Sequence, residues 1–113
     1  GSFEFGREAA LRLFDLPADE RPTSLVALND TQAIGALHAM RERGIEVGRD
    51  FAIVGFDDAP MSQYLIPPLT TIRQPIREAG HKCMELILSL VEGKPIKEKQ
   101  ILLSPLLIER AST

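Results

Sequence analysis

The stretch SLVALNDTQAIGALHAM, residues 24–40, holds the change from strand to helix that decides the fold. It opens with a short apolar run over 24–28, which is typical of a strand buried on both faces. Asn29 then brings a side-chain oxygen that can accept a hydrogen bond from a helix-start amide, and Gln32 follows in a capping-box-like pattern. The apolar residues that come next recur at helical spacing: Ala33, Ile34, Leu37 and Met40. The stretch therefore predicts a buried strand leading directly into an amphipathic helix, with Gly44 as its left-handed stop.

The same alternation of helix and strand runs through the rest of the chain. Apolar spacing predicts a helix over 6–15 and a longer helix from about 76 to 92. Pro17 ends the first helix because proline cannot continue the backbone ladder, whereas Pro75 suits the first turn of the second and Gly93 its end. The remaining apolar segments are predicted strands: 51–56, 69–73, 101–103 and 106–108. We therefore expect the α/β class, with a parallel sheet flanked by helices.

Size and composition exclude several classes of protein. The chain has 113 residues, enough for one domain with a core, and its 13 basic and 16 acidic residues give a net charge of −3. This balance disfavours a nucleic-acid surface, which needs a basic stripe. The single Cys83 excludes an internal disulfide, and the distant His38 and His81 do not make a metal site, so we expect no cofactor. No apolar run approaches the roughly 20 residues that span a bilayer, so we expect no membrane partner.

Polar side chains follow three of the predicted strands at the point where each strand ends. These pairs are Asn29-Asp30, Asp57-Asp58 and Arg73-Gln74. In open α/β sheets, ligands bind outside the carboxyl ends of the strands, so these residues are expected to line one rim. Amide and carboxylate groups suit the hydroxyl groups of a ligand, and an ionised Asp forms the stronger, charge-assisted bonds. The rim therefore predicts a site for a neutral polyol, sugar or nucleoside.

Two other interpretations of these residues stay open at this point. Asn29 and Asp30 can serve only to cap a helix, while Asp57 and Asp58 form a turn. Alternatively, Asp57-Asp58 can hold magnesium for phosphoryl transfer, although no glycine-rich phosphate loop accompanies them.

Four motifs in order resemble the LacI/GalR family of bacterial transcription regulators. They are the Asn-Asp element within 28–37, Val-Gly-Phe-Asp-Asp at 54–58, Pro-Pro-Leu-Thr-Thr-Ile-Arg-Gln at 67–74, and Leu-Ile-Glu-Arg-Ala-Ser-Thr at 107–113. The resemblance covers the chain from about Phe3 to Thr113. It implies one half of a type I periplasmic-binding-protein-like fold, in which the ligand lies in a cleft between two α/β halves joined by three crossovers.

The resemblance also implies how the chain is divided. Residues 1–74 and about 104–113 would form the second α/β half of such a core. Residues of about 75–103 would supply a helix and a strand that pack on the first half. The family reads DNA with an N-terminal helix-turn-helix, and we expect that DNA-binding domain to be absent from these residues.

Site residues carried over by motif fall into two groups. Asn29 and Asp57 match the family's hydroxyl-binding positions, Gln74 lies at the third crossover, and Phe56 and Tyr64 are the candidates for aromatic contact with the ligand. The resemblance places the dimer interface on the helix after the Asn-Asp element and on the loop before the third motif: Ile34, Leu37, His38 and Leu65. The alternative for the two aliphatic residues on that helix is that they belong to the core.

The function implied is the effector-binding and dimerisation part of a cytoplasmic DNA-binding regulator that is not an enzyme. Its effector would be a small molecule, a sugar by preference, and operator DNA would be bound only through the N-terminal domain. The alternative is half of a periplasmic sugar-binding protein that serves a transporter. The long helix would leave Ile76, Ile87 and Leu90 without their usual partner, which predicts self-association through these residues.

Overall fold

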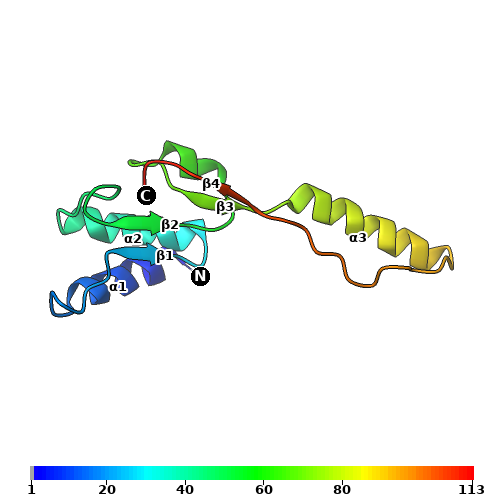
Figure 1. Ribbon diagram of the computed structural model, residues 1–113, viewed down its shortest axis with the longest axis horizontal. Coiled ribbons are helices and arrows are strands. Elements are labelled where there is room, and N and C mark those ends of the chain that lie inside the picture. Colours follow the sequence, from blue (N-terminus) through cyan, green and yellow to red (C-terminus); the bar gives the residue numbers. More distant parts are fainter. Residues whose placement is uncertain (1) are drawn as a thin grey trace. The chain divides into compact units, whose positions relative to one another are not determined.

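The computed structural model describes residues 2–113, which form two units (Figure 1). Unit 1 comprises Gly1–Arg73 together with Leu107–Thr113, and unit 2 comprises Gln74–Leu106. The chain therefore leaves unit 1 after Arg73 and re-enters it at Leu107.

Unit 1 is an α/β layer of parallel strands and helices, as the alternating pattern predicts. Its elements in chain order are α1 (Phe3–Phe14), β1 (Ser24–Val26), α2 (Asp30–Glu42), β2 (Ala52–Val54), the 3-10 helix η1 (Pro60–Tyr64) and β3 (Thr71–Arg73). The returning strand β4 (Leu106–Ile108) begins at the unit boundary and pairs with β3. β1 and β2 are parallel, with Leu25 opposite Ile53. A parallel bridge between Val54 and Thr70 then connects β2 to the start of β3.

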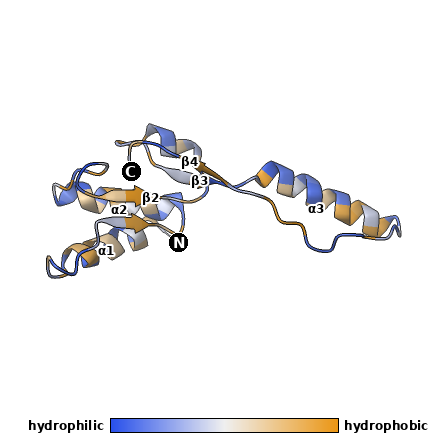
Figure 2. Cartoon of the chain, viewed as in Figure 1, coloured by the Kyte–Doolittle hydropathy of each residue, from blue (hydrophilic) through white to orange (hydrophobic). Residues whose placement is uncertain are grey.

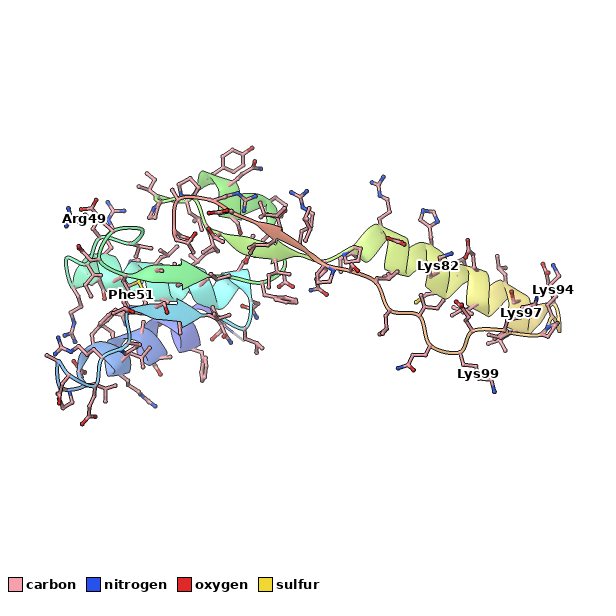
Figure 3. The ribbon with its side chains drawn as sticks, in the orientation of Figure 1. Arg49, Phe51, Lys82, Lys94, Lys97 and Lys99 are labelled. Atoms are coloured by element: carbon pink, nitrogen blue, oxygen red, sulfur yellow. The ribbon has the colours of Figure 1, made fainter. Side chains whose placement is uncertain are left out.

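The core of unit 1 lies between α1, α2 and the strands, and small residues let the two helices approach closely. Ala10, Ala33 and Ala39 are fully buried. A Cβ added to Gly35 would overlap the backbone of Phe3 in α1. The larger core side chains then fill the space beside the strands: Phe14, Leu37, Met40, Phe51, Ile53 and Leu69. β2 and the end of β1 are orange in the hydropathy colours of Figure 2. Phe51, labelled in Figure 3, lies just before β2. Its ring meets the Phe14 ring edge to face at a centroid distance of 5.5 Å.

Several predicted boundaries are corrected by the structure. The first helix begins at Phe3 and not at Gly6, because Ser2 accepts a hydrogen bond from the Phe5 amide at 3.3 Å and caps it. The first two strands end at Val26 and Val54, earlier than the apolar runs suggest. Residues 101–103 are not a strand; only 106–108 is, because a strand requires a neighbour for its backbone groups and β3 supplies one.

Unit 2 consists of α3 (Ile76–Val91) and the segment that follows it. Pro75 is the N-cap residue and not part of the first turn, and Gly93 ends the helix with φ +68°. No residue of α3 is buried. Six of its large apolar residues are more than half exposed: Ile76, Met84, Ile87, Leu88, Leu90 and Val91. Leu86 is half-buried and lines the groove of this unit. Lys82 lies on α3, and Lys94, Lys97 and Lys99 lie on the segment after it (Figure 3).

A groove of about 340 Å³ lies within unit 2, between α3 and residues 95–101. Over residues 2–113, no helix combines the length and the apolar character that a bilayer crossing requires.

Candidate functional site

Backbone hydrogen bonds bring the ends of three strands together at one edge of unit 1. The Ala27 amide donates to the Val54 carbonyl at 2.8 Å, just beyond β1. Three residues after Ala27, the Asp30 amide donates to the Phe56 carbonyl at 2.8 Å. The Asp57 amide in turn donates to the Ile72 carbonyl in β3 at 2.9 Å. The segments that carry Asn29 and Asp57 are therefore neighbours, as the strand-end argument expects.

Asn29 is half-buried and caps α2. Its Oδ1 accepts a hydrogen bond from the Gln32 amide at 2.9 Å, so the capping interpretation holds for this oxygen. The side-chain amide of Asn29 carries two further donor hydrogens. Capping therefore fixes the side chain in place without using its donor group.

Asp57 and Asp58 form a left-handed turn directly after β2. Their φ angles are 119° and 52°, which side chains other than glycine adopt rarely and only with support from their surroundings. The Asp57 side chain is exposed, whereas that of Asp58 is 8% exposed. The two adjacent carboxylates thus face different environments.

Asp30 is buried and accepts three hydrogen bonds with its side chain. It does not cap α2, whose N-cap residue is Asn29. Its Oδ2 accepts from the Ala59 amide at 2.7 Å and from the Ser62 hydroxyl at 2.5 Å. Its Oδ1 accepts from the Thr71 hydroxyl at 2.5 Å. The side chain is 1% exposed, so this one carboxylate connects α2 with the turn, with η1 and with β3 in the interior of unit 1.

Asp58 receives two guanidinium groups. Arg110 Nη2 donates to its Oδ1 at 2.7 Å, and Arg73 Nε donates to its Oδ2 at 2.6 Å. Burial would raise the pKa of Asp58, but the hydrogen bonds from Arg110 and then Arg73 hold that pKa below its usual value. Arg110 also donates to the Leu69 carbonyl at 2.8 Å, which fixes its guanidinium plane.

The last residues bind the middle of β2 and the residue that precedes β3. The Ser112 hydroxyl donates to the Ile53 carbonyl at 2.6 Å and accepts from the Thr70 amide at 2.8 Å. Ser112 is fully buried. Sequence reasoning assigned no role to Arg110 or Ser112, and the only available signal was their place in the closing motif.

The other predicted ligand residues have less definite places. Phe56 is half-buried at the end of β2, next to the turn. Gln74 is the first residue of unit 2, where its carbonyl accepts from the Ile76 amide at 2.9 Å. Tyr64 lies on η1 and lines a different groove, because η1 carries it away from the strand ends.

That second groove contains every residue predicted for the dimer interface. It encloses about 300 Å³, and its lining includes Ile34, Leu37, His38 and Leu65, with Phe3, Arg41, Tyr64 and Ile66. Leu37 is 9% exposed and belongs to the core as well, whereas Ile66 is 89% exposed. The His38 ring meets the Phe3 ring edge to face at 5.7 Å. The groove therefore joins α1, α2 and the segment around η1 into one apolar surface.

Comparison with known proteins gives consistent matches. The profile of the periplasmic binding protein-like domain matches residues 2–113. Over 112 residues the chain is 38% identical to the HTH-type transcriptional repressor CytR of Escherichia coli K12, covering 99% of this chain and 32% of that protein. A LacI-family regulatory protein from Chloroflexus aggregans superposes with a TM-score of 0.94 at 59% identity, over 99% of this chain and 40% of that one.

The lac repressor dimer bound to operator and the anti-inducer ONPF superposes with a TM-score of 0.87 at 35% identity, over 99% of this chain and 38% of that one. The chain spans about a third of the length of the curated relatives it matches, 28% and 32% for two of them. These relatives are transcription repressors and not enzymes, which removes the support for phosphoryl transfer at Asp57-Asp58. The chain belongs to the LacI family of transcription regulators and corresponds to part of their periplasmic-binding-protein-like effector-binding domain.

Proposed function

We propose that this chain binds a neutral, hydroxyl-rich effector through Asn29 and Asp57, within a cytoplasmic regulator that binds operator DNA. The observation that carries the proposal is the junction of the two strand ends, where the Asp30 amide bonds the Phe56 carbonyl. That junction places an amide donor and an exposed carboxylate on adjoining segments. Hydroxyl groups of a sugar, polyol or nucleoside both donate and accept, so they suit this pair.

The charges at this edge favour a neutral ligand over an anion. Three carboxylates, those of Asp30, Asp57 and Asp58, accompany two guanidinium groups, and both guanidinium groups donate to Asp58. A phosphorylated ligand would bring further negative charge to an edge that is already acidic. Phe56 at the turn and Gln74 at the crossover would add an apolar contact and an amide to the effector.

The regulatory step would follow from linkage between effector and operator. The effector changes operator affinity only if it binds the two conformations of the regulator unequally. We propose closure of a cleft about the crossovers as that conformational change. Operator DNA would be bound by a segment outside these residues. The relatives named above give the transporter alternative no support, since they are transcription repressors.

We also propose that the groove around Ile34, Leu37, His38 and Leu65 is the dimer interface. The groove is apolar and continuous across α2 and the segment after η1, and Tyr64 and Ile66 extend it with exposed side chains. The solved lac repressor relative is a dimer. In the 113-residue chain by itself, the exposed face of α3 at Ile76, Ile87 and Leu90 provides a second surface for self-association.

The test of the effector site is isothermal titration calorimetry on the polypeptide that the gene encodes. The probes are glucose, ribose, maltose, sucrose, cytidine and adenosine, with glucose 6-phosphate and cytidine monophosphate as charged counterparts. We expect a neutral compound to bind and Asp57→Asn to weaken its binding at least tenfold, as for loss of a charge-assisted hydrogen bond. Asp19→Asn, an exposed carboxylate in the turn after α1, is the matched control and should bind as the wild type does. Equal affinity in Asp57→Asn, or preference for the phosphorylated compounds, would overturn the proposal.

A further inference from the structure

We infer that Asp58 is a positioning residue that holds the Asp57 turn to both segments by which the chain leaves and re-enters unit 1. The inference rests on the proposed role of Asp57 in effector binding. Asp58 itself is 8% exposed, so it is placed to act on the effector through its neighbours rather than by contact.

The two oxygens of Asp58 have different partners, and each partner belongs to a different segment. Oδ2 receives Arg73 Nε at 2.6 Å, and Arg73 is the last residue before the chain leaves unit 1. Oδ1 receives Arg110 Nη2 at 2.7 Å, and Arg110 lies on the segment that re-enters at Leu107. One carboxylate therefore joins the exit and the return of the chain.

The turn that carries Asp57 depends on this support. Asp57 and Asp58 both have positive φ, a conformation that persists only when surrounding contacts over-determine it. The backbone amides on either side of Asp58 are well bonded: the Asp57 amide donates to the Ile72 carbonyl at 2.9 Å, and the Ala59 amide donates to Asp30 Oδ2 at 2.7 Å. The Asp58 amide itself makes only a long bond, to the Thr71 hydroxyl at 3.2 Å. The two charge-assisted bonds to the Asp58 side chain are shorter and stronger. Loss of these two bonds is therefore expected to loosen the turn at Asp58 and to widen the range of positions that Asp57 takes, while the bonds of the Asp57 and Ala59 amides remain.

The arrangement also gives the effector a route to the crossovers. A displacement of Asp57 is passed to Asp58 through one peptide unit, and from Asp58 to Arg73 and Arg110. Because each guanidinium is held by a separate oxygen of Asp58, the Asp58–Arg73 and Asp58–Arg110 hydrogen bonds can break independently. A carboxamide at position 58 keeps one acceptor oxygen and turns a donor group toward the other guanidinium. Asp58→Asn therefore removes at least one of the two arginine hydrogen bonds without changing the size of the side chain.

The variants are Asp58→Asn, Arg73→Met and Arg110→Met in the polypeptide that the gene encodes. Arg43→Met is the matched control, because Arg43 pairs with Asp15 at 2.9 Å and is about as exposed as Arg73, at 44% and 54%. The first measurement is amide hydrogen exchange without ligand, followed for three segments: 57–59, 71–74 and 107–110. Thermal midpoints are recorded alongside, to separate local loosening from general loss of stability.

We expect Asp58→Asn to speed exchange at least tenfold in 57–59 and in one or both of the other segments, with α1 unchanged. Arg73→Met should loosen 57–59 and 71–74 and leave 107–110 protected, and Arg110→Met should loosen 57–59 and 107–110. Arg43→Met should alter none of the three. Two results would overturn the inference. One is unchanged exchange at 57–59 in Asp58→Asn, Arg73→Met and Arg110→Met, and the other is faster exchange spread evenly over unit 1. If Asp58→Asn does not fold, the two arginine variants decide the question alone.

The second measurement is calorimetric titration of the same variants with the neutral panel named above. We expect about a tenfold loss of affinity in Asp58→Asn for any panel compound that the wild type binds. If exchange responds as expected and no panel compound binds the wild type, the positioning role of Asp58 in the turn stands and the proposed effector class fails. If Asp57→Asn weakens binding while Asp58→Asn changes neither exchange nor affinity, the effector site stands and the positioning role of Asp58 fails.

Discussion

At the scale of single residues, Asp58 makes the stability of unit 1 depend on pH in acid. Its folded-state pKa lies below the unfolded value of about 3.9, since the bonds from Arg110 and Arg73 outweigh the opposing effect of burial. The stabilisation is therefore complete above about pH 4 and is lost as the pH falls through the folded-state pKa. We expect thermal midpoints measured between pH 2 and 7 to fall less steeply below pH 4 in Asp58→Asn than in the wild type. Asp19→Asn should follow the wild type, and parallel curves for Asp58→Asn and the wild type would contradict the assignment.

The sequence identified these carboxylates but not their partners. Asp30 and Asp58 follow apolar strands, and that position alone marked them as candidates for the ligand-binding rim. The partners lie far along the chain: Thr71 is 41 residues from Asp30, and Arg110 is 52 residues from Asp58. No periodic pattern links residues so far apart, because such pairs are set by how strands and turns come together in three dimensions.

At the scale of elements, the packing of α1 on α2 depends on small residues at their contact. A Cβ on Gly35 would overlap the backbone of Phe3 in α1, which cannot give way as a flexible side chain can. We expect Gly35→Ala to lower the free energy of unfolding by about 1–3 kcal/mol, as for other overpacked interiors. Gly80→Ala is the control, since a Cβ there meets nothing within 4 Å and alanine favours a helix interior. Denaturant unfolding followed by circular dichroism measures both, and an equal response of the two variants would count against close helix contact.

Elements with a strong local signal were predicted well, and those that depend on a distant neighbour were not. The cap at Asn29 and the stops at Gly44 and Gly93 are local, and the structure has all three. Residues 101–103 have the same apolar composition as 106–108, but only the latter meets β3. Composition alone cannot distinguish two such segments, because pairing requires a free strand edge.

At the scale of the whole molecule, the association of chains distinguishes the two apolar surfaces proposed above. In the 113-residue chain, Leu65→Asp should weaken dimers formed through the groove, whereas Ile87→Lys with Leu90→Lys should weaken those formed through α3. Burying a charge in either apolar contact would be costly. Sedimentation velocity measures the mass, and Glu78→Gln with Glu85→Gln is the control that makes α3 more positive by the same amount. A dimer mass that persists when Leu65→Asp, Ile87→Lys and Leu90→Lys are combined would contradict association through either surface.

The return of residues 107–113 to unit 1 has a consequence for synthesis on the ribosome. Ser112 supplies buried hydrogen bonds to Ile53 and Thr70, yet residues 74–106 are translated between those positions and the returning segment. The nascent chain therefore emerges with the first part of unit 1 lacking its closing strand while α3 is still being made. During that interval the edge of β3 is open to chaperones and to other nascent chains. The order in which this chain is translated is thus not the order in which its units are completed.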